Sequence, residues 1–164
     1  KRTSTTGYSL SPQSLSKIST GTKLVIPSPN GSYLTLLTEN KLTVCGCLRN
    51  CEAVARFAQE YGSQIAVIPA GEKWEDGSLR PGLEDLIGAG AILSYLSGVL
   101  SPEAEAAVAV FNSFKNDLLG TLKKCSSGKE LIHRGFESDV ELAAEINVSD
   151  CVPVFTDNAY VRLN

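Results

Sequence analysis

The sequence predicts an α/β protein with three layers, α/β/α, around a largely parallel central sheet. Short apolar runs alternate with longer segments of helical periodicity, and Gly or Pro separates many of them. The run at 64–69 is apolar over most of its length, as strands covered by helices on both faces are. Alternation of strands and helices is typical of parallel sheets. We expect one domain over residues 1–164.

The expected strands are short and rich in β-branched residues. They cover, in order, 23–26, 42–45, 64–69, 152–155 and 160–163. Pro27 and Pro29 close the first strand, since proline lacks the donor that a sheet requires. Residues 33–37 fit either a short helix or a strand.

Caps and apolar spacing identify the expected helices. Apolar residues at 54, 57, 58 and 61 have the spacing of one buried helix face, with Asn50 as N-cap and Gly62 as the stop. Ser101 begins a helix whose apolar spacing continues to Leu122. Further helices are expected at 82–96, 128–135 and 138–146. The "GAGA" within 82–96 predicts close packing of that helix on the sheet.

Composition and charge exclude several classes of function. The net charge is -3 and no Lys/Arg cluster occurs, so we expect neither nucleic acid nor an anionic membrane as a partner. The uncharged run 87–101 is too short and too rich in Gly and Ser to span a bilayer. We expect a cytoplasmic protein.

The five cysteines do not resemble a secreted disulfide framework, because their number is odd and they are scattered. Cys45, Cys47 and Cys51 do lie close together in the sequence. Their spacing differs from that of zinc sites, which favours buried thiols over a metal site.

Polar residues gather in the loops that follow the first three strands, where a parallel sheet binds its ligands. These residues are Asn30, Gly31, Ser32, Arg49, Asn50, Glu72, Asp76, Glu84 and Asp85. Amides and Arg suit phosphate oxygens, and carboxylates suit Mg2+. The loops therefore predict an anion held beside a hard cation.

Each of these features also has a structural interpretation. The Asn-Gly pair is typical of plain turns, and Glu84 and Asp85 suit the first turn of a helix. Asn50 suits a helix cap, and Arg49 suits a surface charge. From the residues alone, both interpretations stay open.

Several known phosphate chemistries have no matching motif. The sequence contains no GxxxxGK[ST], which excludes a P-loop, and no Cys followed six residues later by Arg, which excludes the common cysteine phosphatases. No two aspartates stand two apart, so the usual aspartyl-phosphate motif is missing. A single histidine excludes a two-histidine phosphatase, and the lack of GxSxG excludes an α/β-hydrolase.

Several segments resemble, in the same order, the 2-phosphosulfolactate phosphatase family. They read "KLVIPSPNGS", "GCLRNCEAVARFA", "IAVIPAG", "GLEDLIGAGAI" and "GFESDVELAAEI". The resemblance covers about residues 7 to 155. Each motif alone is weak, but their order and spacing together are specific.

The resemblance implies an α/β, Mg2+-dependent acid phosphatase that converts 2-phospho-3-sulfolactate to 3-sulfolactate and phosphate, a step of coenzyme M synthesis in archaea. Together with the polar residues of the loops, the resemblance assigns Asn30, Asn50 and Asp85 as catalytic residues and Glu84 and Asp85 as metal ligands. The assigned substrate-binding residues are Gly31, Ser32, Arg49, Gly71 and Glu72. Asp139 falls on a late acidic position of unclear role.

Two departures accompany the resemblance. Ser28-Pro29 stands where the family usually has Thr-Thr, and Leu10 stands before Ser-Pro where Asn is usual. Family members also carry an N-terminal segment with an Asp-x-x-Arg-Ala motif that is absent here. We therefore expect the C-terminal portion of a longer phosphatase. A metal-activated water, Cys45 and a residue of that segment all remain candidates for the nucleophile.

Two other functions stay open. One is a phosphatase for another small phosphorylated acid, and the other is a relative that has lost catalysis and only binds a small anionic ligand. In each case we expect a small phosphorylated sulfonate or carboxylate as the partner, and homo-oligomerisation is left open.

Overall fold

The structure, a computed structural model, describes residues 9–19, 21–22, 24–25, 29–38 and 41–162. The helices are α1 (Pro12–Leu15), α2 (Pro29–Leu36), the 3-10 turn η1 (Leu48–Asn50), α3 (Cys51–Tyr61), α4 (Leu83–Leu93), α5 (Pro102–Phe114), the 3-10 turn η2 (Lys115–Asp117), α6 (Leu118–Lys124), α7 (Ser126–His133) and α8 (Glu137–Ala143). The strands are β1 (Glu72–Lys73), β2 (Leu79–Arg80), β3 (Pro153–Thr156) and β4 (Ala159–Arg162).

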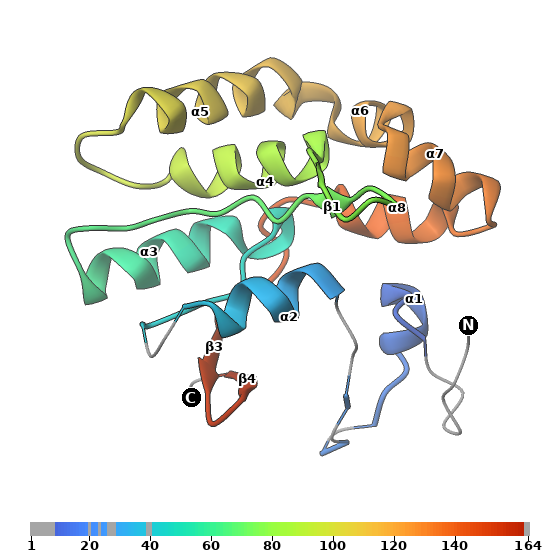
Figure 1. Ribbon diagram of the computed structural model, residues 1–164, viewed down its shortest axis with the longest axis horizontal. Helices are drawn as coiled ribbons and strands as arrows, with labels where there is room; N and C mark the ends of the chain where they lie inside the picture. Colours follow the sequence, from blue (N-terminus) through green and yellow to red (C-terminus); the bar gives the residue numbers. More distant parts are fainter. Residues whose placement is uncertain (1–8, 20, 23, 26–28, 39–40, 163–164) are drawn as a thin grey trace.

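Helices supply most of the core. Figure 1 shows α4 between α3 and α5, with α6, α7 and α8 grouped at one end. The buried core comprises Leu48, Cys51, Val54, Ala55, Ile87, Ala91, Ile92, Phe111, Leu118, Leu122, Cys125 and Val140. Most of these residues lie on α3, α4, α5 and α6, so the apolar faces of helices bury one another.

The helix predicted from Ser101 is confirmed at its start and ends earlier than expected. The Ser101 Oγ accepts a hydrogen bond from the Ala104 N–H at 3.3 Å, with proline following at the first helical position. The helix ends at Phe114, and Asp117 begins α6 by accepting the Gly120 N–H at 3.0 Å. This second cap divides the predicted helix into two.

Helix α3 has the predicted bounds, but its start is held by a residue distant in the sequence. The Asn50 side chain makes no capping bond to α3. Instead, Asn147 Oδ1 accepts the Glu52 N–H at 2.9 Å and the Cys51 thiol at 3.0 Å. The buried face is formed by Cys51, Val54 and Ala55, whereas the expected Tyr61 is exposed.

The late strands are confirmed as an antiparallel hairpin of β3 and β4. The predicted strand at 42–45 forms a single antiparallel bridge, Val44 to Val154. The Cys45 N–H donates to Pro153 O at 2.9 Å, and the Phe155 N–H donates to Thr43 O at 2.8 Å. Residues 43–45 therefore extend the hairpin at its edge.

The expected buried strands at 23–26 and 64–69 are wrong for the residues that the structure describes. Val25 is 93% exposed and Ile68 is 62% exposed, while Lys23 and residues 26–28 lie outside the described part. Residues 64–70 run extended and make no backbone hydrogen bond to another described residue. An apolar run becomes a buried strand only when neighbouring strands pair with it.

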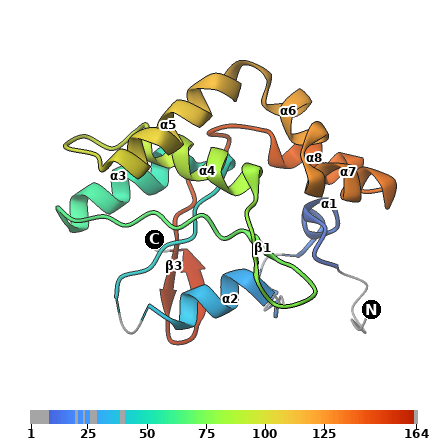
Figure 2. The same ribbon diagram turned by 45° about the horizontal axis from the view of Figure 1, so that its top comes forward.

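The predicted parallel central sheet is not seen among the described residues. Their two sheets are two-stranded and antiparallel, β1 with β2 and β3 with β4. Figures 1 and 2 show the extended chain before β1 lying alongside α3 and α4. Over the same part of the chain, no helix has the length and apolar character needed to cross a membrane.

The "GAGA" segment packs against a helix, not a sheet. A Cβ on Gly90 of α4 would lie 2.1 Å from Ala107 O and 2.9 Å from Phe111 Cβ, both on α5. A Cβ on Gly88 would meet nothing within 4 Å. Close approach of α4 and α5 therefore requires glycine at position 90 but not at position 88.

These two glycines predict opposite effects of the same substitution. Gly90→Ala should lower the free energy of unfolding by about 2–3 kcal/mol, because it overpacks the contact with α5. Gly88→Ala should raise it by about 0.5–1 kcal/mol, because alanine favours the helix. Urea unfolding followed by circular dichroism measures both. Equal effects would contradict the described packing of α4 on α5.

Candidate functional site

The chain after the expected third strand forms a β-hairpin of β1 and β2, which Gly71 precedes. Gly71 has a φ of +64°, and a Cβ there would lie 2.9 Å from Leu79 Cδ1 and 3.1 Å from Arg80 O. Glycine is favoured on both counts. In the hairpin Glu72 pairs with Arg80, and Asp76 closes the turn by accepting hydrogen bonds from the Ser78 N–H and Oγ–H.

Two carboxylates approach Gly82, at the start of α4. A Cβ on Gly82 would lie 2.4 Å from Asp85 Oδ2 and 3.3 Å from Glu84 Oε1. A side chain at position 82 would therefore crowd both carboxylates. Asp85 Oδ2 also accepts the Gly71 N–H at 3.0 Å, which ties α4 to the hairpin.

The surroundings of Asp85 disfavour its charge. Burial raises the pKa of the Asp85 carboxyl, the charges of Glu84 and Glu72 raise it further, and the Gly71 N–H opposes the increase. A bound cation would relieve this repulsion. Both acids also lie in the first turn of α4, where a negative charge interacts favourably with the helix dipole.

Asn30 reaches the same hairpin from α2. Its Nδ2 donates to Glu72 Oε2 at 2.9 Å, and Lys73 Nζ lies 4.7 Å from the centre of the Tyr33 ring. The Asn30-Gly31 pair does not form the plain turn that its sequence suggested, because these residues lie in the first turn of α2. Figure 2 shows the hairpin beside this helix. The first N–H groups of a helix have no partner within it, so they retain anion-binding capacity.

The structure brings together some of the predicted site residues. Asn30, Gly71, Glu72, Glu84 and Asp85 are joined by direct contacts or neighbour one another around the hairpin. Gly31 and Ser32 follow Asn30 in α2.

Asn50 is engaged in holding two segments of the chain. It is 6% exposed; its Oδ1 accepts the Cys47 N–H at 2.8 Å, and its Nδ2 donates to Cys151 O at 2.8 Å and Cys45 O at 3.3 Å. The bridge at Val44 would place Cys47 opposite Cys151 in a continued antiparallel pairing. The carboxamide takes the place of a direct bond between them.

Arg49 is directed toward α8. Its Nη1 donates to Leu142 O at 2.9 Å and forms an ion pair with Glu145. Among the described residues, neither Arg49 nor Asn50 hydrogen-bonds to the hairpin or to Glu84 or Asp85. These contacts give both residues a structural role.

Arg80 also lies at the hairpin, although it was not among the polar loop residues named from the sequence. It faces Glu72 across the hairpin, and its Nη1 donates to Glu130 Oε1 at 2.9 Å. Its position just before Pro81 and the helix acids was the available signal in the sequence.

Asp139 has a defined structural partner. This buried carboxylate accepts hydrogen bonds from Ser11 Oγ at 2.8 Å and from the Gln13 N–H at 3.1 Å. It thereby attaches α1 to α8 and joins two segments of the family resemblance.

The pKa values of two of the clustered thiols, Cys45 and Cys51, are raised. Burial raises the pKa of Cys51 to about 11 and also raises the pKa of Cys45, with a further contribution from Cys47. A protonated Cys45 is a poor nucleophile.

Within the described ranges, no three His, Cys, Asp or Glu residues gather as a metal-binding group. Mg2+ commonly uses only one or two protein carboxylates, so Glu84 and Asp85 fit such a site.

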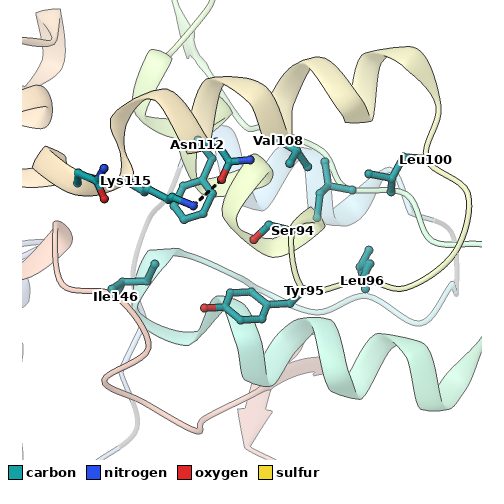
Figure 3. A pocket seen from close by; sticks show the side chains of 11 residues that line it. Ser94, Tyr95, Leu96, Leu100, Val108, Asn112, Lys115 and Ile146 are labelled. Atoms are coloured by element: carbon teal, nitrogen blue, oxygen red, sulfur yellow. Dashed lines mark hydrogen bonds between the residues drawn. The ribbon is translucent and has the colours of Figure 1, made fainter.

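Two cavities lie elsewhere in the fold and contain none of the predicted site residues. The cavity in Figure 3 has a volume of about 590 Å³ and lies between the C-terminal end of α4 and α5, with Tyr95, Asn112 and Lys115 at its rim. The second, of about 770 Å³, lies along α3 near Val148. The α4 cavity is at the opposite end of the helix from Glu84 and Asp85, so we place the candidate site at the hairpin.

Comparison with known proteins decides the family. The sequence pattern of the family described as 2-phosphosulpholactate phosphatase matches residues 2–158. The chain belongs to this family. Its relatives include the 2-phosphosulfolactate phosphatase of Methanothermobacter thermautotrophicus, which is 30% identical over 137 residues, covering 84% of this chain and 58% of the relative.

Other relatives in the phosphatase family have similar coverage. The probable 2-phosphosulfolactate phosphatase of Thermosynechococcus vestitus is 31% identical over 81% of this chain and 57% of its own length. That of Thermus thermophilus is 31% identical over 87% of this chain and 60% of its own length. The chain therefore spans somewhat more than half the length of these relatives.

Removal of the Asn50 carboxamide should destabilise the fold. Asn50→Ala leaves one N–H and two carbonyl groups without their partner, which should lower the free energy of unfolding by about 2–4 kcal/mol. Asn116→Ala, at an exposed position, is the control and should change it by less than about 0.5 kcal/mol. Urea unfolding measures the difference, and similar values for both variants would contradict the described role.

Removal of the Asp85 charge should stabilise the fold at neutral pH. A carboxyl whose pKa is raised in the folded state favours folding while protonated, and this contribution is lost as the pH rises through the folded pKa. Asp85→Asn keeps an acceptor for the Gly71 N–H, so it should be more stable than wild type at pH 7. The advantage should shrink toward pH 4. Asp85→Ala removes the acceptor and should be less stable than Asp85→Asn at each pH, as measured by thermal unfolding.

Proposed function

We propose that this protein is a Mg2+-dependent phosphatase that converts 2-phospho-3-sulfolactate to 3-sulfolactate and phosphate. The observation that carries the proposal is the approach of Glu84 Oε1 and Asp85 Oδ2 to Gly82, in a member of the 2-phosphosulpholactate phosphatase family. The Gly71 N–H links Asp85 to the hairpin, where Glu72 bonds to Asn30. The names of the relatives supply the substrate.

Glu84 and Asp85 would hold the Mg2+. Once bound, the ion would neutralise charge on the phosphoryl oxygens and polarise the phosphorus toward attack. The residues of the chain hold the substrate: the Asn30 amide and the first N–H groups of α2 donate to phosphoryl oxygens. Asn30 would exchange its bond to Glu72 for the substrate.

Hydrolysis adds one water molecule across the ester. The water oxygen bonds to phosphorus, the bond from phosphorus to the C2 oxygen breaks, and that oxygen takes a proton to become the hydroxyl of sulfolactate. We favour water over Cys45 as the nucleophile, because the pKa of this thiol is raised.

The predicted parallel sheet belongs to the same proposal. Residues 64–70 are extended, Ile68 is exposed, and these residues have no backbone partner in the described part of the chain. The cytoplasmic location stays a prediction from the composition, and the place in coenzyme M synthesis stays a prediction from the resemblance.

Release of phosphate tests the activity. We expect Mg2+-dependent release from 2-phospho-3-sulfolactate and loss of release with EDTA. Faster release from 2-phospholactate would favour a phosphatase for another small acid. Stabilisation of the protein by substrate without turnover would favour a relative that only binds. No release and no stabilisation would contradict the proposal.

The metal site has its own test. Mg2+ alone should raise the melting temperature of the wild type, and Glu84→Gln or Asp85→Asn should weaken Mg2+ binding by about 10-fold or more. Glu103→Gln is the matched control, because Glu103 is also a first-turn acid, on α5. Equal Mg2+ responses in all variants would favour a dipole role alone for Glu84 and Asp85.

A further inference from the structure

Arg80 lies on the hairpin of the candidate site, opposite Glu72, and its guanidinium forms an ion pair with Glu130. Its backbone is fixed by the pairing with Glu72 and by the close approach of Gly71 to the Arg80 carbonyl. The chain then continues through Pro81 into α4, which carries Glu84 and Asp85. Arg80 is therefore held by the same hairpin that orients Asp85.

The Arg80 side chain is oriented and still has unused donors. It is 19% exposed, and its guanidinium lies 5.4 Å from the centre of the Trp74 ring. Of the five N–H donors of a guanidinium, only the Nη1 group bonds to another described residue, Glu130. The Glu130 side chain is mostly exposed, so its contact with Arg80 can exchange with a ligand.

The negative charges at the site make a cationic side chain necessary for binding an anionic substrate. Glu72, Glu84, Asp85 and Glu130 would repel a substrate that carries several negative charges. Arg80 bonds to Glu130 and lies opposite Glu72 in the hairpin, and the charges of Glu130, Glu72 and Glu84 raise its pKa. Lys73 is held over the Tyr33 ring.

We propose that Arg80 binds the anionic group of the substrate that is not transferred, its sulfonate or its carboxylate, and that Glu130 occupies Arg80 until substrate replaces it. This inference rests on the proposed function. A guanidinium matches such groups because it donates two parallel hydrogen bonds to two oxygens. Lysine keeps the charge but cannot provide this pair of donors.

Kinetics of paired variants test the exchange. Arg80→Lys should raise KM for 2-phospho-3-sulfolactate about 10-fold or more, with little change in kcat. Glu130→Gln should lower KM, because it removes the competing carboxylate. If the pair only attached the hairpin to α7, both variants would raise KM and lower the melting temperature together, and that result would overturn the proposal.

A control variant and a second substrate complete the test. Arg56→Lys, in the exposed Arg56–Glu52 pair of α3, is the matched control and should leave KM unchanged. With 2-phospholactate, which lacks the sulfonate, the effect of Arg80→Lys should vanish if Arg80 binds sulfonate and persist if it binds carboxylate. An equal KM for wild type and Arg80→Lys on both substrates would overturn the proposal.

Product binding separates this inference from the proposed function. If the wild type releases no phosphate, the proposed function fails, and calorimetry with 3-sulfolactate still tests Arg80. Binding to the wild type that weakens about 10-fold in Arg80→Lys supports the role of Arg80. Equal binding to both proteins, or binding to neither, overturns it.

Discussion

The close contact between α4 and α5 at Gly90 is the constraint on which the rest of the structure depends. It allows α4 to pack between α5 and α3, with Ile87 and Ala91 fully buried. Helix α4 carries Glu84 and Asp85 at its start, and Asp85 in turn holds the hairpin through Gly71. Packing of the core thus determines where the carboxylates of the candidate site lie.

Local signals in the sequence predicted local structure well. Ser101 followed by proline and the apolar spacing of 51–61 identified helices, because caps and one-sided burial act within a few residues. The predicted strand at 64–69 is not formed among the described residues, because a strand is defined by partners elsewhere in the chain. The same limit explains Asn147, whose capping of α3 spans 95 residues of sequence.

The candidate site was partly predictable for a related reason. Glu72, Glu84 and Asp85 were proposed because carboxylates in the loops after predicted strands suit Mg2+. In the structure the Gly71 N–H links Asp85 to the hairpin that carries Glu72. Arg49 was assigned to the site and Arg80 was not, because residue type alone does not show which arginine contacts the hairpin. Their partners separate them: Arg49 bonds to the backbone of α8, and Arg80 lies beside the carboxylates.

The crowding of carboxylates around Asp85 links two equilibria. A cation and a proton compete for the same oxygens, so binding of the proposed Mg2+ would displace a proton from any protonated Asp85 carboxyl. Metal affinity should therefore increase with pH across the titration range of Asp85 and level off above it. The Gly71 N–H favours the ionised form, and the hairpin thus adjusts the acidity at which the site can accept its metal.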